Sequence, residues 1–134
     1  MTRQPSMTFY SGKKPRAYPE SQLQRAVIQF LKLSGAPNLI FFACPNGVPM
    51  ARRTIAHQLS IGLLPGVADL VIVHDGQAMF LEIKAKGGKQ QPSQIAFEKL
   101  CKANSSAYAV VDNINDAIKQ LTAWGVISYS RKVA

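Results

Sequence analysis

Two acids and a lysine stand where this 134-residue chain could bring them together: Asp69, Glu82 and Lys84. The acids belong to two apolar runs, DLVIVH at 69–74 and AMFLEIK at 78–84, separated by an Asp-Gly pair that is a strong hairpin signal. A two-residue turn at this pair brings Asp69 directly opposite Glu82. Opposed residues on one face of a hairpin have Cβ atoms about 4.5–5.5 Å apart. The sequence therefore predicts two neighbouring carboxylates at the end of apolar strands.

The chemistry of such a pair depends on what neutralises it. Two carboxylates in contact share either a proton or a cation, and strand alternation places Glu82 and Lys84 on one face. Oxygen ligands without histidine or cysteine favour Mg²⁺ or Mn²⁺ over zinc. The alternative is a surface cluster in which Lys84 only neutralises the two acids. The bare D…ExK spacing arises by chance about one time in seven, so the hairpin register carries much of the argument.

The charge balance points to a polyanionic partner. The chain has 16 Lys and Arg against 7 Asp and Glu, a net charge of +9, which is typical of nucleic-acid binding. A solvated basic surface is the alternative. If Glu20, Asp69 and Glu82 serve a site, 4 of the 7 acids remain against 16 basic residues. The candidate DNA contacts are Arg52, Arg53, Lys86, Lys89, Lys13 and Lys14.

Composition excludes several other classes of protein. A hydrophobic content of 47% excludes a disordered chain, and no apolar run approaches the roughly 20 residues of a membrane span. The first residues lack the apolar core of a secretory signal. Two cysteines, Cys44 and Cys101, are too few for a disulfide scaffold or a four-cysteine zinc site. We therefore expect reduced, buried cysteines in a cytoplasmic protein that has no membrane partner.

The elements that must position the site predict an α/β fold. Residues 1–18 form a basic arm, and residues 19–134 form one domain. A helix at Pro19–Leu33 carries Glu20 on its core-facing stripe, at the start of the helix. The other predicted elements are a strand at Leu39–Ala43, a helix from about Met50 to Ile61, a flexible loop at Ala85–Gln91, a helix from about Pro92 to Ala103, a strand at Ala107–Val111, and a helix from about Ile114 to Trp124 capped by Asp112 or Asn113.

The motifs resemble those of a known nuclease superfamily. PGVAD at 65–69 followed by LEIKAK at 81–86 resembles the PD-(D/E)xK superfamily. PNG at 45–47, two arginines, GLLPGVADLVIV, FLEIKAKGG and QPSQIAF together resemble a VRR-NUC domain, of the type that stands alone in bacteriophages. The resemblance covers roughly Glu20 to Val111, although Ala68 stands where the pattern has proline. It implies a restriction-endonuclease-like core with a mixed sheet of about four strands flanked by helices.

The resemblance also implies a metal site. Asp69, Glu82 and the backbone carbonyl of Ile83 would bind Mg²⁺ or Mn²⁺. Glu20 would complete the acidic cluster and hold a second metal ion or its waters. Phosphodiester hydrolysis adds negative charge to an anionic phosphate, and a divalent cation offsets that charge.

Two further residues receive roles from the resemblance. Lys84 would orient the attacking water or stabilise charge on the phosphate, and Gln94 would position Lys84 or the water. The function indicated is a metal-dependent DNA endonuclease acting on branched or otherwise structured DNA, such as Holliday junctions. The alternatives are a restriction-type duplex cutter, a non-catalytic DNA-binding module, and a structural subunit of a phage assembly.

One metal site in a small chain favours a homodimer. A single centre cuts one strand at a time, so cutting two strands needs a second subunit. The apolar residues after the last helix, Val126, Ile127 and Tyr129, lie near Trp124 and could form an interface. The alternative is that this tail packs back on its own helix.

Overall fold

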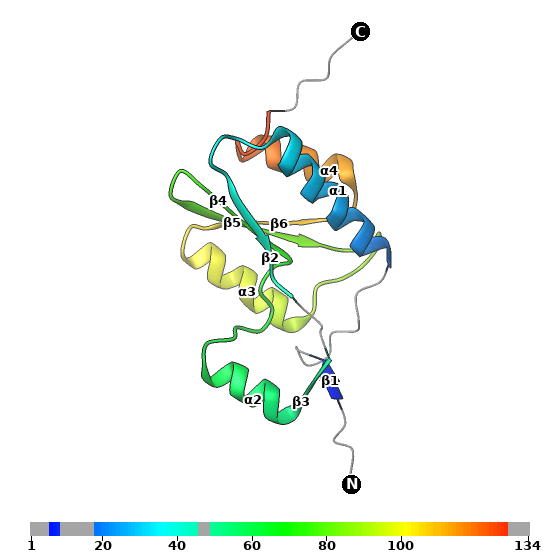
Figure 1. Ribbon diagram of the computed structural model, residues 1–134, viewed down its shortest axis with the longest axis vertical. Helices are drawn as coiled ribbons and strands as arrows, with labels where there is room; N and C mark the ends of the chain where they lie inside the picture. Colours follow the sequence, from blue (N-terminus) through cyan, green and yellow to red (C-terminus); the bar gives the residue numbers. More distant parts are fainter. Residues whose placement is uncertain (1–5, 9–17, 46–48, 129–134) are drawn as a thin grey trace.

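The structure is a computed structural model, and it describes residues 6–8, 18–45 and 49–128 (Figure 1). Four helices and six strands lie in these ranges. The helices are α1 (Tyr18–Ser34), α2 (Arg52–Ser60), α3 (Pro92–Ala103) and α4 (Ile114–Ala123). The strands are β1 (Ser6–Thr8), β2 (Ile40–Ala43), β3 (Pro49–Ala51), β4 (Leu70–His74), β5 (Gln77–Ile83) and β6 (Ala107–Val111).

A four-stranded mixed sheet in the order β2-β4-β5-β6 forms the centre of the molecule. The pairs β2–β4 and β4–β5 are antiparallel, while β6 runs parallel to β5 after the crossover through α3. The β4–β5 register has His74 opposite Gln77 and Leu70 opposite Leu81, as the sequence predicts. The turn residues Asp75 and Gly76 have φ of 50° and 75°, which is the conformation of a two-residue hairpin turn that suits the strand twist. The predicted fold class is confirmed.

Helices cover both faces of this sheet, with α1 and α4 on one side and α3 on the other (Figure 1). Leu70, Ile72, Leu81 and Ile83 point toward α1 and α4, where they join Val27, Leu31 and Leu121 in the main core. The residues between them point the other way. Phe80 packs edge-on against Phe97 of α3, with ring centroids 5.1 Å apart. This alternation sends Glu82 and Lys84 to the α3 face.

The segment before the main sheet differs from the prediction. Met50 and Ala51 belong to β3, which pairs with β1 from the predicted N-terminal arm, so α2 begins at Arg52 rather than at about Met50. None of the residues of α2, all of which the structure describes, is buried. β1, β3 and α2 lie below the four-stranded sheet in Figure 1.

The C-terminal tail corrects the basis of the dimer prediction. Val126 and Ile127 have exposed fractions of 0% and 4% and belong to the main core. The carbonyl of Val126 accepts a hydrogen bond from Ala36 N, and Ile127 forms an isolated antiparallel β-bridge with Gly35. The tail therefore packs back on its own domain, so Val126 and Ile127 offer no interface. Tyr129 lies outside the described residues.

Two further findings concern the cysteines and the lengths of the helices. Cys101 is buried, as predicted, but Cys44 is only half-buried, and neither forms a disulfide. None of the helices that the structure describes is long and apolar enough to cross a membrane.

Candidate active site

The two acids and the lysine are all buried at one end of the β4–β5 hairpin. Asp69 directly precedes β4, Glu82 lies in β5, and Lys84 directly follows β5. The exposed fractions of Asp69, Glu82 and Lys84 are 0%, 0% and 5%. Surface clusters keep their charges in water, so the alternative of a surface salt bridge does not describe these residues.

Asp69 ties the hairpin end together through its side chain. Its Oδ2 accepts a hydrogen bond of 2.8 Å from the backbone N of Ile83 on the opposite strand. Its backbone carbonyl accepts another, of 2.9 Å, from Cys44 N at the end of β2. Burial and the nearby Asp69 charge both raise the pKa of the Cys44 thiol, as expected for a thiol close to a carboxylate.

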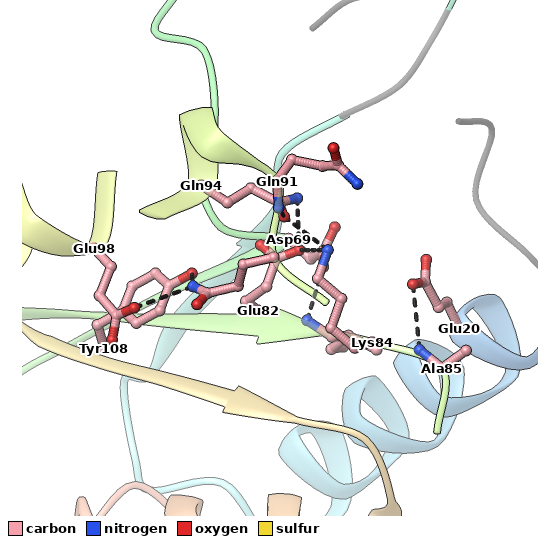
Figure 2. A network of polar contacts seen from close by, with 11 residues as sticks. Glu20, Asp69, Glu82, Lys84, Ala85, Gln91, Gln94, Glu98 and Tyr108 are labelled. Carbon is pink, nitrogen blue, oxygen red and sulfur yellow. Dashed lines mark hydrogen bonds and ion pairs between the residues drawn. The ribbon is translucent and has the colours of Figure 1, made fainter. Parts of the chain in front are cut away.

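Lys84 and Glu82 are joined directly and through Gln94 of α3 (Figure 2). Lys84 Nζ lies 3.4 Å from Glu82 Oε1 and donates a hydrogen bond of 2.8 Å to Gln94 Oε1. Gln94 Nε2 donates to Glu82 Oε1 at 3.1 Å, and Gln94 is itself only 1% exposed. The amide therefore has one orientation that satisfies both charged neighbours, because only its oxygen can accept from an ammonium.

The first turn of α3 is built to hold Gln94 in this place. Pro92 occupies a favoured first helical position, and the side chains of Gln91 and Gln94 form a reciprocal capping box. Gly66, just before Asp69 in the chain, packs against this turn. A Cβ at Gly66 would collide with the carbonyl oxygen of Ser93, and Gly66 has φ of +81°. Glycine at position 66 therefore brings the chain that carries Asp69 against the helix that carries Gln94.

Glu20 reaches the same end of β5 from the first turn of α1 (Figure 2). Its carboxylate is half-buried, and Oε1 accepts a hydrogen bond of 3.2 Å from Ala85 N. Among the described residues there is no group of three or more His, Cys, Asp or Glu side chains that could hold a metal ion. The role of Glu20 as a metal ligand stays a prediction, as does that of the Ile83 carbonyl.

A second polar cluster, which the sequence did not suggest, extends the network along α3. Gln90 Nε2 donates hydrogen bonds to Glu98 Oε1 at 3.1 Å and to the hydroxyl of Tyr108 at 3.0 Å. Burial raises the pKa of Tyr108 above its ordinary value, and the charge of Glu82 raises it further. The phenol therefore holds its proton more tightly than an ordinary tyrosine does.

The basic residues predicted to touch DNA are exposed where the structure describes them. Lys86 and Lys89 lie between β5 and α3, beside the buried network, and Arg52 and Arg53 begin α2. No ion pair or hydrogen bond found among the described residues joins Arg52 or Arg53 to the network. Lys13 and Lys14 lie outside the described ranges.

The donor set fits a hard divalent cation. Among the residues that the structure describes, Asp69 and Glu82 supply two fully buried carboxylates and Lys84 supplies one buried ammonium, so a cation would balance the remaining negative charge. Mg²⁺ is commonly held by one or two carboxylates while it keeps several waters. The pair therefore suits Mg²⁺ or Mn²⁺ without needing a third acidic ligand.

Comparisons with known proteins support the architecture. No family model matches this chain, and no curated protein matches it in sequence. The fold is similar to a solved structure described as a VRR_NUC domain, with a TM-score of 0.57. The match covers 81% of this chain and 99% of that one, at 17% sequence identity. The class that the fold defines is thus an α/β domain with a four-stranded mixed sheet flanked by helices, similar in fold to the solved VRR_NUC domain.

Proposed function

We propose that this protein is a metal-dependent endonuclease that hydrolyses phosphodiester bonds in DNA. The observation that carries the proposal is the buried network of Asp69, Glu82, Lys84 and Gln94 at the hairpin end. Burying two acids and a lysine is costly, and such groups are concentrated at functional sites. The similarity to the solved VRR_NUC domain and the motif resemblance point in the same direction.

The two acids would hold the metal ion. Asp69 and Glu82 would bind Mg²⁺ or Mn²⁺, with the Ile83 carbonyl as a further oxygen ligand and Glu20 nearby for a second ion or its waters. A bound divalent ion offsets charge on the phosphate and lowers the pKa of a coordinated water. Asp69 keeps its place because Ile83 N holds one of its oxygens.

Lys84 would act on the phosphate or on the attacking water. An ammonium has three N–H donors. Gln94 Oε1 takes one of them at 2.8 Å, and Glu82 Oε1 lies 3.4 Å away. A third donor is left to stabilise charge that develops in the transition state. Gln94 positions Lys84 because it bonds to the lysine and to Glu82 through different atoms.

The DNA would lie over this site and against basic side chains. Arg52, Arg53, Lys86 and Lys89 are exposed, and the chain has a net charge of +9, so a phosphate backbone is the fitting partner. We extend the proposal to branched DNA, with two chains acting together. Each chain has one centre, and cutting two strands at a junction requires two centres related by symmetry.

Cleavage assays separate the proposal from its alternatives. Labelled linear duplex, flap and four-way-junction DNA are incubated with the protein in Mg²⁺, Mn²⁺ or EDTA. The proposal expects cleavage of junction or flap DNA with either metal and none in EDTA. Preferential cutting of linear duplex would indicate the restriction-type alternative. Tight binding without cleavage in either metal would indicate a non-catalytic module, and sedimentation of the junction complex would show whether two chains take part.

A further inference from the structure

The segment between Lys84 and α3 is held at both ends. At its start, Ala85 N donates to Glu20 Oε1 at 3.2 Å, and Gly88 N donates to Ala85 O at 2.7 Å to close a turn. Gly87 has φ of +77°, and a Cβ at Gly88 would lie 2.9 Å from Ala85 O, so both glycines suit this turn. The sequence suggests a flexible loop here, whereas the structure has a defined turn.

At the other end, the side chain of Gln90 ties the segment to two different elements. Its amide nitrogen bonds to Glu98 of α3 at 3.1 Å and to Tyr108 of β6 at 3.0 Å. A primary amide has two N–H donors, so both are used. All three side chains are half-buried, which makes these hydrogen bonds less open to exchange with water. Figure 2 shows Glu98 and Tyr108 at one end of the polar network and Lys84 toward the other.

The backbone next to Gln90 shares an acceptor atom with Lys84. Gln91 N donates to Gln94 Oε1 at 2.7 Å, and the same oxygen accepts from Lys84 Nζ at 2.8 Å. A shift of the chain at residues 90–91 therefore changes the position of this oxygen. The ammonium of Lys84 would move with this oxygen, and so would the Gln94 amide nitrogen that donates a hydrogen bond to Glu82.

From these contacts we propose that Gln90, anchored by Glu98 and Tyr108, is a positioning residue that sets the place of the Lys84 ammonium. The proposal rests on the function proposed above. Lys86 and Lys89 lie two and five residues beyond Lys84, in the segment between the anchored residues Ala85 and Gln90. Gln90 would touch neither the DNA nor the metal ion, and it would act through Gln91 and Gln94.

The test combines a structural measurement with kinetics. In Gln90→Ala the segment loses one of its two anchors, so trypsin should cut after Lys86 and Lys89 several times faster than in the wild type. Misplacing a catalytic group by about 1 Å costs up to about 100-fold in rate. We therefore expect kcat on junction DNA to fall by about 10- to 100-fold, with KM within about threefold. Loss of folded protein would also lower the apparent kcat at unchanged KM, so kcat is calculated per folded molecule, with the folded fraction taken from thermal unfolding.

Three further variants test whether the effect depends on the hydrogen bonds of Gln90. Glu98→Gln retains a carbonyl oxygen for Gln90 and should behave as the wild type does. Lys102→Met removes an ion pair of 3.1 Å to the other oxygen of Glu98, Oε2, and should also change neither measurement. Tyr108→Phe deletes one acceptor of Gln90 and should show a smaller effect of the same kind, and it decides the matter if Gln90→Ala does not fold.

The outcomes separate the two proposals. An active wild type with unchanged kcat and trypsin resistance in Gln90→Ala would overturn the positioning role alone. A rise in KM with no change in kcat would also overturn it, since that result would place Gln90 in DNA binding. A wild type with no metal-dependent activity would overturn the proposed function and the positioning role together, while trypsin would still show whether Gln90 anchors the segment.

Discussion

Replacing Lys84 with methionine removes a buried cation that lies beside two buried acids. Lys84 is 5% exposed and Glu82 is 0% exposed, and their charged atoms are 3.4 Å apart. Removing one partner of a buried ion pair costs about 3–5 kcal/mol, because the remaining charge has lost its compensation. With an unfolding entropy of about 2.1 cal/mol/K per residue, the 134 residues lose about 3.5 °C in Tm for each kcal/mol. The variant should therefore melt about 10–18 °C below the wild type.

The assay is thermal unfolding in EDTA, and the chain supplies its own control. Lys102 forms a Lys–Glu contact of 3.1 Å with Glu98, one helical turn away, but its side chain is 70% exposed. Exposed pairs of this kind contribute about 0.3–0.5 kcal/mol, so Lys102→Met should lower Tm by about 2 °C or less. If the two variants lose the same small amount, the Lys84–Glu82 pair behaves as a solvated salt bridge and our account of the buried charges is refuted.

Three further predictions concern individual side chains. Asp69→Asn should abolish cleavage but keep DNA binding in gel-shift assays. Its Tm in EDTA should not fall, because the amide oxygen still accepts the backbone hydrogen bond and a like-charge contact is relieved. Full activity in this variant would contradict the assignment of Asp69 to the active site. Arg52→Ala and Arg53→Ala should each weaken binding and reduce the slope of log affinity against log salt by about one unit, whereas an unchanged slope would remove that arginine from the interface. The raised pKa of Tyr108 means that the folded state holds the phenolic proton more tightly than the unfolded state does. The free energy of unfolding should thus fall as pH rises above about 10, and denaturant titrations should find a smaller fall in Tyr108→Phe than in the wild type. Equal falls in the two proteins would contradict the raised pKa of Tyr108.

The parts of the fold that the sequence predicts well are those encoded locally. The Asp-Gly turn fixes the β4–β5 register, and the predicted opposition of the two strands is the observed one. The bounds of α3 and β6 are also as predicted, and Asn113, one of two candidate caps, accepts the capping hydrogen bond from Asp116 N. In each case a turn or cap residue and a clear apolar pattern act over a few neighbouring positions.

The parts that the sequence did not predict depend on contacts between distant segments. β1 and β3 are three-residue strands about 40 positions apart, too short to show an alternating pattern. Val126 and Ile127 look like spare apolar surface in the sequence, but they fill the core beside α1. Pairing across such separations depends on the assembled core rather than on local preference.

The candidate site shows the same division. The acids and Lys84 follow from the hairpin register, whereas Gln94 was predicted only from the resemblance, and its two partners appear once α3 packs on the sheet. The cluster around Gln90 joins residues 8 and 18 positions away. Glutamine, glutamate and tyrosine at those spacings form no recognisable motif, so only the structure brings them together.

The most direct test of the central claim is single-turnover cleavage of labelled four-way-junction DNA by the wild type and by Glu82→Gln, each in Mg²⁺ and in EDTA. Glutamine keeps the shape of Glu82 and can still meet Lys84 and Gln94 through its oxygen, but it removes one of the two buried negative charges. We predict cleavage by the wild type in Mg²⁺ only, and no cleavage by Glu82→Gln in either condition although it still binds the junction. Cleavage by the wild type in EDTA, or undiminished cleavage by Glu82→Gln in Mg²⁺, would contradict the assignment of this buried network as a metal-dependent nuclease site.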